Sequence, residues 1–263
     1  MVTQGELSSY EKVQKAREKD RPGVMDYIEV LFDDFIELHG DRLYRDDPSI
    51  VGGIGLFHGV PVTLVGQRKG KTTDENIHCN FGMTSPEGYR KAKRLMEQAE
   101  KFHRPVITLI DTPGAYPGIE AESNGQSNAI AESMAFMSRI RVPSIAVITG
   151  EGSSGGALAL AVCDSVWMLE NAVYSILSPE GYASILWKDA KRASEASDLM
   201  KLTAQELRDF GLIDGIIDEG DALYSQMDQM LRKELSRLRK QKTAVLVQNR
   251  YRKFRKFDTA YRQ

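Results

Sequence analysis

Residues 143–162, which read PSIAVITGEGSSGGALALAV, constrain the fold of this chain more than any other stretch. Residues 144–149 form a short apolar run, rich in β-branched side chains and preceded by a proline, which predicts a buried strand. Glycines follow at Gly150, Gly152, Gly155 and Gly156, and residues 157–162 form an apolar run that predicts a helix. The stretch therefore predicts a strand, a glycine loop and a buried helix in succession.

Such a loop can bind an anion, because the first N–H groups of a helix have no partner within the helix. Residues 150–155 match the dinucleotide-binding pattern Gly-x-Gly-x-x-Gly, and Glu170 lies at the spacing of a ribose-binding acid. Residues 152–156 also match the nucleophile elbow of hydrolases, which would make Ser154 the nucleophile. That fold places its histidine after the serine, whereas all four histidines here precede Ser154. A tight turn that serves only helix–sheet packing is a further alternative.

A second loop follows another predicted strand. Residues 106–110 form a buried apolar run, and residues 111–118 (DTPGAYPG) lead from it into a predicted helix at about residues 125–140. Neighbouring strands would bring both loops to one edge of the core, where their backbone N–H groups would share one site. Such donors can polarise a carbonyl without a charged catalytic side chain, which suits chemistry on enolates and thioesters.

The rest of the chain alternates between helical and strand patterns. Helices are predicted at residues 7–18, 24–38, 85–102, 178–187, 189–200, 203–210 and 221–240. Residues 51–57 and 60–67 predict a β-hairpin with His58 in its turn, and residues 66–81 predict a polar loop. Short strands are predicted at residues 166–169 and 174–177 and within 211–218. Serial short strands and crossover helices predict an α/β superhelix.

Length and composition allow one large α/β domain with helical extensions, since 263 residues with 41% hydrophobic content can bury a full core. No apolar run reaches the roughly 18 residues of a membrane span, and residues 1–20 lack the apolar centre of a signal peptide, so we expect a cytoplasmic protein without membrane contact. Cys79 and Cys163 are the only cysteines. They cannot build a disulfide framework or a cysteine zinc site, so any zinc would come with a partner.

The C-terminal tail is strongly basic. After residue 241 the chain carries seven Lys and Arg residues and a single acid, Asp258. Tyr251, Phe254, Phe257 and Tyr261 occur there at near-helical spacing. We interpret the tail as a basic helix docked on an acidic body or on a partner subunit, rather than as a nucleic-acid or membrane site.

Five short motifs stand out in the chain, namely residues 80–83 (NFGM), 86–92 (PEGYRKA), 111–118, 150–159 (GEGSSGGALA) and 178–181 (SPEG). Together they resemble the carboxyltransferase alpha subunit of bacterial acetyl-coenzyme A carboxylase. The similarity runs from about Asp26 to Ile217. It implies a crotonase-like fold, an α/β superhelix of ββα units. We expect a core at residues 41–220, an N-terminal helical segment at 1–40 and a basic helical extension at 221–263.

The resemblance also implies an enzymatic reaction. Members of this family transfer the carboxyl group of carboxybiotin, held on a separate biotin carboxyl carrier protein, to acetyl-coenzyme A and form malonyl-coenzyme A for fatty acid synthesis. The alpha subunit is expected to act only with a beta subunit in an α2β2 assembly. That beta subunit would bring the zinc and most of the coenzyme A pocket, and a separate biotin carboxylase would use the ATP.

The same resemblance implies roles for individual residues. The N–H groups of Gly155, Gly156 and Ala157 would hold the ureido oxygen of biotin, and this chain would supply no metal ligand. Substrate contacts are implied for Pro113, Gly114, Ala115, Gly152 and Ser154. A rival interpretation makes the chain a scaffold for a catalytic partner, but a scaffold would have no use for two exposed glycine loops.

Overall fold

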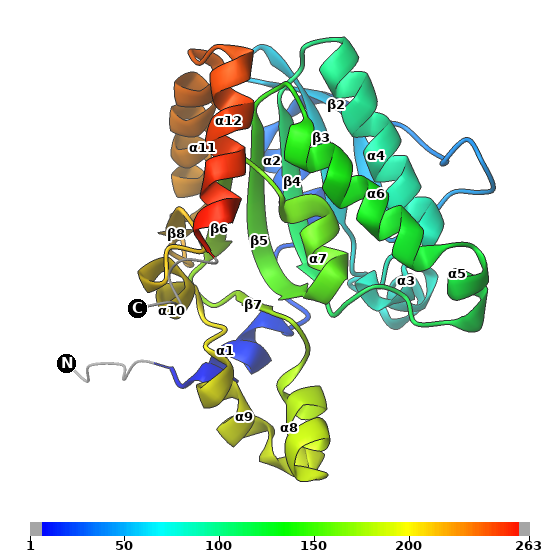
Figure 1. Cartoon of the computed structure of the whole chain (residues 1–263), viewed down its shortest axis with the longest axis vertical. Coiled ribbons are helices and arrows are strands. Elements are labelled where there is room, and N and C mark those ends of the chain that lie inside the picture. Colours follow the sequence, from blue (N-terminus) through cyan, green and yellow to red (C-terminus); the bar gives the residue numbers. More distant parts are fainter. Residues whose placement is uncertain (1–6, 258–263) are drawn as a thin grey trace.

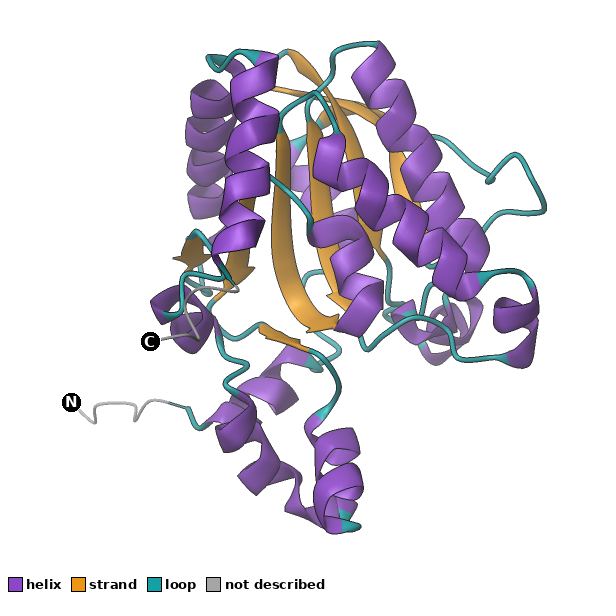
Figure 2. Ribbon diagram, viewed as in Figure 1, coloured by secondary structure: helices purple, strands orange, loops and turns teal. Residues whose placement is uncertain are grey.

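In residues 7–257, which the computed structural model describes, eight strands form one sheet in the order β1-β2-β3-β4-β5-β6-β8, with β7 paired to the end of β5 (Figure 1). The strands are β1 (Asp33–Glu37), β2 (Ile50–Phe57), β3 (Val60–Gln67), β4 (Val106–Thr112), β5 (Ser144–Ser153), β6 (Ser165–Leu169), β7 (Val173–Ser175) and β8 (Gly215–Ile217). β1 to β3 pair antiparallel, and β3, β4, β5, β6 and β8 pair in parallel. The carboxyl ends of the parallel strands therefore meet at one edge of the sheet, which is the lower edge in Figure 2.

Helices cover both faces of this sheet. They are α1 (Ser9–Ala16), α2 (Val24–Leu31), α3 (Thr73–His78), α4 (Pro86–Lys101), α5 (Ile119–Ser123), α6 (Gln126–Arg139), α7 (Ser154–Ala161), α8 (Pro179–Trp187), α9 (Ala193–Met200), α10 (Ala204–Asp209), α11 (Leu223–Arg239) and α12 (Thr243–Lys256). In Figure 2, α4, α6 and α7 lie in front of the sheet, whereas α1, α8 and α9 form a lobe below its lower edge. Within residues 7–257 no helix has the length and apolar character needed to cross a membrane.

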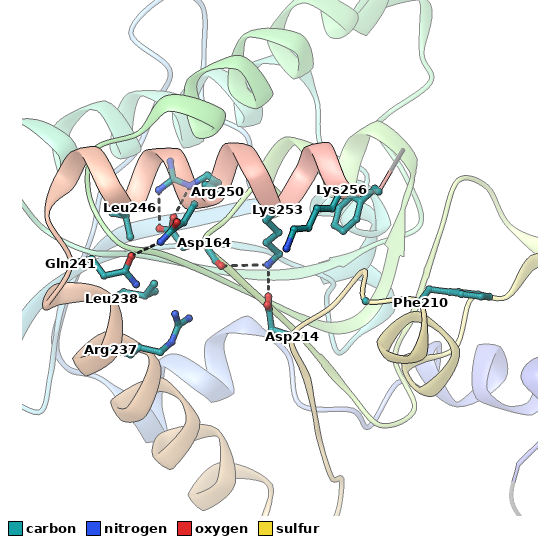
Figure 3. A pocket seen from close by; sticks show the side chains of 13 residues that line it. Asp164, Phe210, Asp214, Arg237, Leu238, Gln241, Leu246, Arg250, Lys253 and Lys256 are labelled. Atoms are coloured by element: carbon teal, nitrogen blue, oxygen red, sulfur yellow. Dashed lines mark hydrogen bonds and ion pairs between the residues drawn. The ribbon is translucent and has the colours of Figure 1, made fainter. Parts of the chain in front are cut away.

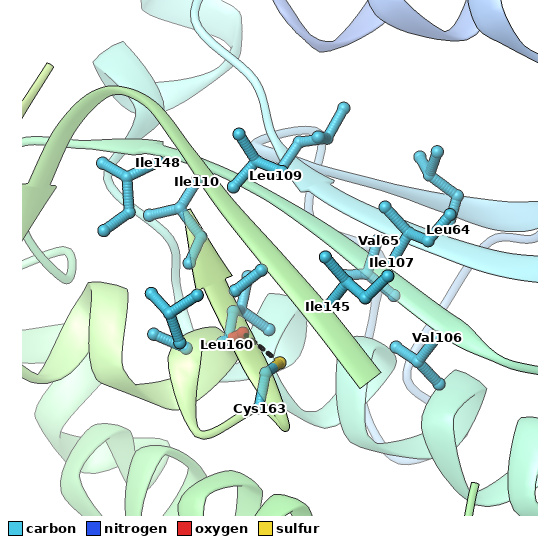
Figure 4. Packing of buried hydrophobic residues seen from close by; sticks show 14 of the residues in the cluster. Leu64, Val65, Val106, Ile107, Leu109, Ile110, Ile145, Ile148, Leu160 and Cys163 are labelled. Atoms are coloured by element: carbon cyan, nitrogen blue, oxygen red, sulfur yellow. Dashed lines mark hydrogen bonds between the residues drawn. The ribbon is translucent and has the colours of Figure 1, made fainter. Parts of the chain in front are cut away.

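The central strands form the core of the molecule. All ten residues of β5 are buried, and β4 is almost as deeply covered. Parallel strands with helices on both faces read as continuous apolar runs, which is the pattern that predicted β4 and β5 from the sequence. Figure 4 shows Ile107, Ile145 and Leu160 among the side chains that fill the space around these strands.

Most of the predicted elements are confirmed, including the β-hairpin with His58 in its turn and the helices α4, α6, α8 and α10. The helix predicted at residues 24–38 is wrong beyond Leu31, because residues Asp33–Glu37 form the edge strand β1. Gly53 permits this pairing, since a Cβ there would lie 2.1 Å from the carbonyl oxygen of Ile36. The spacing of apolar residues in this segment is compatible with a helix and with a strand, and pairing with β2 selects the strand.

Two further predictions need correction. The polar loop predicted at residues 66–81 contains helix α3, which begins with a capping box between Thr72 and Glu75. The helix predicted at residues 189–200 is broken into a short 3₁₀ turn at Ala190–Arg192 and helix α9. The proposed division into segments 1–40, 41–220 and 221–263 stays a prediction.

The basic tail is docked on the body of the protein, as one of the two predicted alternatives states. Arg250 on α12 is buried, and its Nε and Nη2 atoms lie 2.9 and 2.8 Å from the two carboxylate oxygens of Asp164 (Figure 3). Arg250 Nη1 also donates to the carbonyl oxygens of Met137 and Ile140 at the end of α6. Lys253, one turn on, pairs with Asp214. Tyr261 lies outside the described residues.

We predict that Arg250→Met lowers the free energy of unfolding by about 3 to 5 kcal/mol, because it leaves the buried Asp164 carboxylate without its cation. Urea unfolding followed by circular dichroism measures this change. Arg252→Met is the matched control, since Arg252 is exposed on the same helix and its replacement is expected to change stability by less than about 0.5 kcal/mol. Equal losses in the two variants would contradict the role assigned to Arg250.

Candidate functional site

The candidate site begins where β5 passes directly into α7. The sequence predicted a loop at residues 150–156, but β5 continues to Ser153 and α7 starts at Ser154, so Gly150 and Gly152 belong to the strand. Gly155 is half-buried, whereas Gly156 and Ala157 are buried in the first turn of the helix. Gly155 and Gly156 lie in the first turn of α7, where backbone N–H groups have no acceptor within the helix, whereas the Ala157 N–H is placed to bond the carbonyl of the N-cap residue Ser153. The helix start therefore offers unpaired backbone donors, as its position in the chain requires.

Ser154 makes the sharp turn between strand and helix. Its φ of 55° is left-handed, a conformation that costs a non-glycine residue about 1 to 2 kcal/mol. Strain of this kind is typical of functional sites. The Ser154 side chain is exposed, and no hydrogen bond of its hydroxyl is found in the part of the chain that the structure describes. His39 and His58 contact Asp46 and Asp228 instead, so neither supplies the base that a serine nucleophile needs.

The two predicted loops meet at this point. A Cβ on Gly156 would lie 2.8 Å from the backbone nitrogen of Ala115 and 3.0 Å from the carbonyl carbon of Gly114. Thr112 holds the second loop in place, because its Oγ1 accepts from the Gly114 N–H at 3.0 Å and lies 2.8 Å from the carbonyl oxygen of Gly82. The prediction that the loops share one edge of the sheet is confirmed, and glycine at position 156 is what permits their close contact.

A cluster of charged side chains lies beneath the two loops. The ammonium group of Lys69 is 2.7 Å from Asp111 Oδ1 and 3.0 Å from Glu151 Oε2. Asp111 Oδ1 also accepts from the backbone N–H of Glu151 at 2.9 Å. A Cβ on Gly150 would lie only 2.4 Å from the same oxygen, so this glycine allows the carboxylate to approach the strand.

The N-terminal helix α1 adds a second cation to the cluster. Arg17, just after α1, contacts Glu151 Oε1 at 2.7 Å and Glu180 Oε1 at 2.9 Å. Burial alone would raise the pKa of Glu151, but Lys69 and Arg17 outweigh this effect and hold the pKa below its usual value. Burial would likewise lower the pKa of Lys69, yet Asp111 and Glu151 raise it. The sequence analysis missed this cluster, because its members are far apart in the chain.

An apolar cavity of about 450 Å³ opens beside the start of α7. Ser154, Gly155 and Leu158 line one side, and Tyr174 lines another. Phe254 on α12 and Phe257 just after it also line the cavity, although their spacing in the sequence indicated only a docked helix face. Gly114 and Ala115 lie against Gly156, and neither they nor Pro113 line this cavity. Gly152 is buried and faces Ile148 and Tyr174.

A larger cavity of about 710 Å³ lies between α11, α12 and the segment after α10 (Figure 3). Its lining includes Arg237, Arg250 and Lys253, but each of these cations has an acidic partner, namely Glu234, Asp164 and Asp214. The paired charges indicate a role in docking α12, and the apolar cavity beside Gly155 is the stronger candidate for a binding site.

Comparison with known proteins identifies close relatives of this chain. A family model described as acetyl co-enzyme A carboxylase carboxyltransferase-like matches residues 2–258. An acetyl-coenzyme A carboxylase carboxyl transferase subunit alpha from Clostridium acetobutylicum is 51% identical, over 97% of this chain and 96% of that protein. A beta/alpha fusion from Natranaerobius thermophilus is 53% identical over 95% of this chain and 42% of its own length.

Solved structures share the fold. A transcarboxylase 12S chain superposes with a TM-score of 0.72 at 19% identity, over 92% of this chain and 47% of that chain, so this chain spans about half of it. A chain of a Pseudomonas malonate decarboxylase hetero-tetramer superposes with a TM-score of 0.65 at 15% identity, over 78% and 85% of the two chains. The crotonase-like fold expected from the sequence is confirmed.

We predict that Gly156→Ala lowers the free energy of unfolding by about 1 to 3 kcal/mol, because the new methyl group would overlap the Gly114–Ala115 backbone. Gly155→Ala is the matched control. Its Cβ would meet the Ile130 side chain at ordinary contact distance, 3.4 Å from Cγ2 and 3.9 Å from Cδ1, so we expect unchanged stability or a gain of up to about 1 kcal/mol from helix propensity. Urea unfolding compares the two variants, and equal stability would show that the loops do not depend on their close contact.

Proposed function

Because this chain belongs to the acetyl co-enzyme A carboxylase carboxyltransferase-like family, we propose that it is the alpha subunit of such a carboxyltransferase and moves a carboxyl group from biotin to acetyl-coenzyme A, giving malonyl-coenzyme A. The observation that carries this proposal is the contact between Gly156 and the Gly114–Ala115 peptide, which brings the loop after β4 and the first turn of α7 together in one site. A site of backbone donors suits a reaction in which negative charge develops on a carbonyl oxygen.

The residues around the apolar cavity fit biotin. The biotin ring system is uncharged and largely apolar, with one ureido oxygen that accepts hydrogen bonds. The cavity offers the apolar walls of Leu158, Tyr174 and Phe254, and Gly155, in the first turn of α7 where N–H groups have no acceptor within the helix, also lines it. We propose that Gly155, Gly156 and Ala157 hold the ureido oxygen, while Ser154 borders the ring. When bound, biotin supplies the carboxyl group that is transferred.

The chain's own contribution is electrostatic. N–H groups at a helix start carry partial positive charge, and the helix dipole adds to it. They stabilise negative charge that grows on the bound oxygen during transfer, and removing one such donor typically costs about 10² to 10³ in turnover. The loop of Pro113, Gly114 and Ala115 contributes by contacting the first turn of α7 at Gly156. No side chain of this chain acts as a base in this proposal.

Partners complete the proposed enzyme. The Natranaerobius relative joins beta and alpha subunits in one chain, which supports a beta subunit as the partner here. We propose an α2β2 assembly in the cytoplasm in which the beta subunit holds the zinc and most of the coenzyme A. A separate carrier protein would present the biotin, and a separate biotin carboxylase would load it with ATP. The alternative that this chain is only a scaffold does not explain the unpaired N–H groups at α7.

The proposal predicts that the chain is active only with its beta subunit. Malonyl-coenzyme A and biocytin, a soluble biotin derivative, are mixed with each subunit alone and with both, and the acetyl-coenzyme A formed is measured. The rate of acetyl-coenzyme A formation by the mixture is expected to exceed the rate with either subunit alone by at least about 10²-fold. This is the size of the effect of losing one oxyanion donor. An inactive but assembled mixture would refute the proposed function. Activity of the chain alone would place the coenzyme A pocket on this subunit.

A further inference from the structure

Lys69 lies just past the end of β3 and bridges two carboxylates, one in β4 and one in β5. Its ammonium group contacts Asp111 at 2.7 Å and Glu151 at 3.0 Å. Its aliphatic stem runs close to Gly82, where an added Cβ would lie 2.9 Å from Lys69 Cγ. Lys69 does not line the apolar cavity beside Gly155.

Each carboxylate partner of Lys69 lies near the end of a strand, shortly before one of the two segments that meet at Gly156. Asp111 belongs to β4 and precedes the loop of Pro113, Gly114 and Ala115. Glu151 belongs to β5 and precedes the first turn of α7 by a few residues. The register of β4 and β5 shifts between Ile110 and Thr112 and pairing resumes at Thr112 and Gly152. At this irregular point the Asp111 carboxylate accepts from the Glu151 N–H, and Lys69 adds a second connection between the two strands.

We propose that Lys69 is a positioning residue for carboxyl transfer, which sets the distance between the two loops by binding Asp111 and Glu151 together. The inference rests on the proposed function, because that function assigns the start of α7, which the second loop contacts, to the binding of biotin. It adds a residue that touches neither biotin nor coenzyme A but decides whether the donors around Gly156 lie where the reaction needs them.

Burial and a contact with Arg17 fix the position of the Glu151 carboxylate. Its side chain is only 8% exposed, and its second oxygen is held at 2.7 Å by Arg17. Without Lys69, the carboxylates of Asp111 and Glu151 would lose the cation that they share. The two negative charges would then repel each other. The loops would move apart or turn. A misplacement of about 1 Å at a catalytic centre can cost about 10²-fold in rate.

The test compares Lys69→Met with Lys69→Arg and with Lys93→Met in the assembled alpha–beta complex. Lys93 is the matched control, because it also bridges two carboxylates, Glu97 and Glu132, but lies between α4 and α6 away from the loops. Lys69→Met is expected to lower kcat by about 10- to 100-fold with KM for malonyl-coenzyme A changed less than about twofold. Lys69→Arg should restore most of kcat, and Lys93→Met should match wild type.

Hydrogen–deuterium exchange provides a readout that does not depend on activity. In Lys69→Met, peptides that cover residues 112–118 and 150–158 should exchange at least about tenfold faster than in wild type, while Lys93→Met leaves them unchanged. If Lys69→Met fails to fold, Glu151→Gln replaces it, since it keeps the shape and removes the charge; its kcat is also expected to fall about tenfold.

The outcomes separate the two proposals. A wild-type complex without carboxyl transfer refutes the proposed function, while the exchange data still decide whether Lys69 holds the loops. An active wild type with unchanged kcat and unchanged exchange in Lys69→Met, or in Glu151→Gln where that variant replaces it, overturns the inference about Lys69. A lower melting temperature with unchanged kcat also overturns it, because Lys69 would then only stabilise the fold.

Discussion

The close contact of Gly156 with the Gly114–Ala115 peptide is the constraint on which the site depends. Parallel pairing of β4 and β5 brings the ends of both strands to one edge, but it does not bring their loops into contact. That contact needs a residue without a side chain in the first turn of α7. The left-handed Ser154 then turns the chain from strand to helix without a connecting loop, so the N–H groups of the helix start lie directly at the sheet edge.

Ion pairs attach the first and the last helix of the described chain to the rest of the protein. Arg17 ties the N-terminal helix to Glu151 beneath the loops, and Arg250 ties the C-terminal helix to Asp164 beside α6. A guanidinium group suits both places, because it can donate to two acceptors at once and stays charged when buried. The C-terminal helix in turn carries Phe254 and Phe257 to the apolar cavity. Both extensions thus reach the candidate site, although the motifs that identify the family lie in the core.

Sequence patterns correctly predicted those helices and strands that are determined by residues close together in the chain. The apolar runs of β4 and β5, the Pro and Glu at the start of α4, and the capping box of α10 each have a short-range cause. Residues 32–38 were assigned to a helix because their pairing with β2 depends on a distant glycine, Gly53. The Lys69 cluster and the wall formed by Phe254 were missed for the same reason. Their partners lie far away in sequence, and no spacing rule connects them.

The central claim is that the start of α7 holds the ureido oxygen of biotin, and a crystal structure of the alpha–beta complex with biocytin tests it most directly. The account predicts the ring in the apolar cavity beside Gly155, with its ureido oxygen about 2.7 to 3.1 Å from a backbone nitrogen of Gly155, Gly156 or Ala157. A ring bound elsewhere, or a ureido oxygen held by side chains while these N–H groups have no contact with it, would contradict the account.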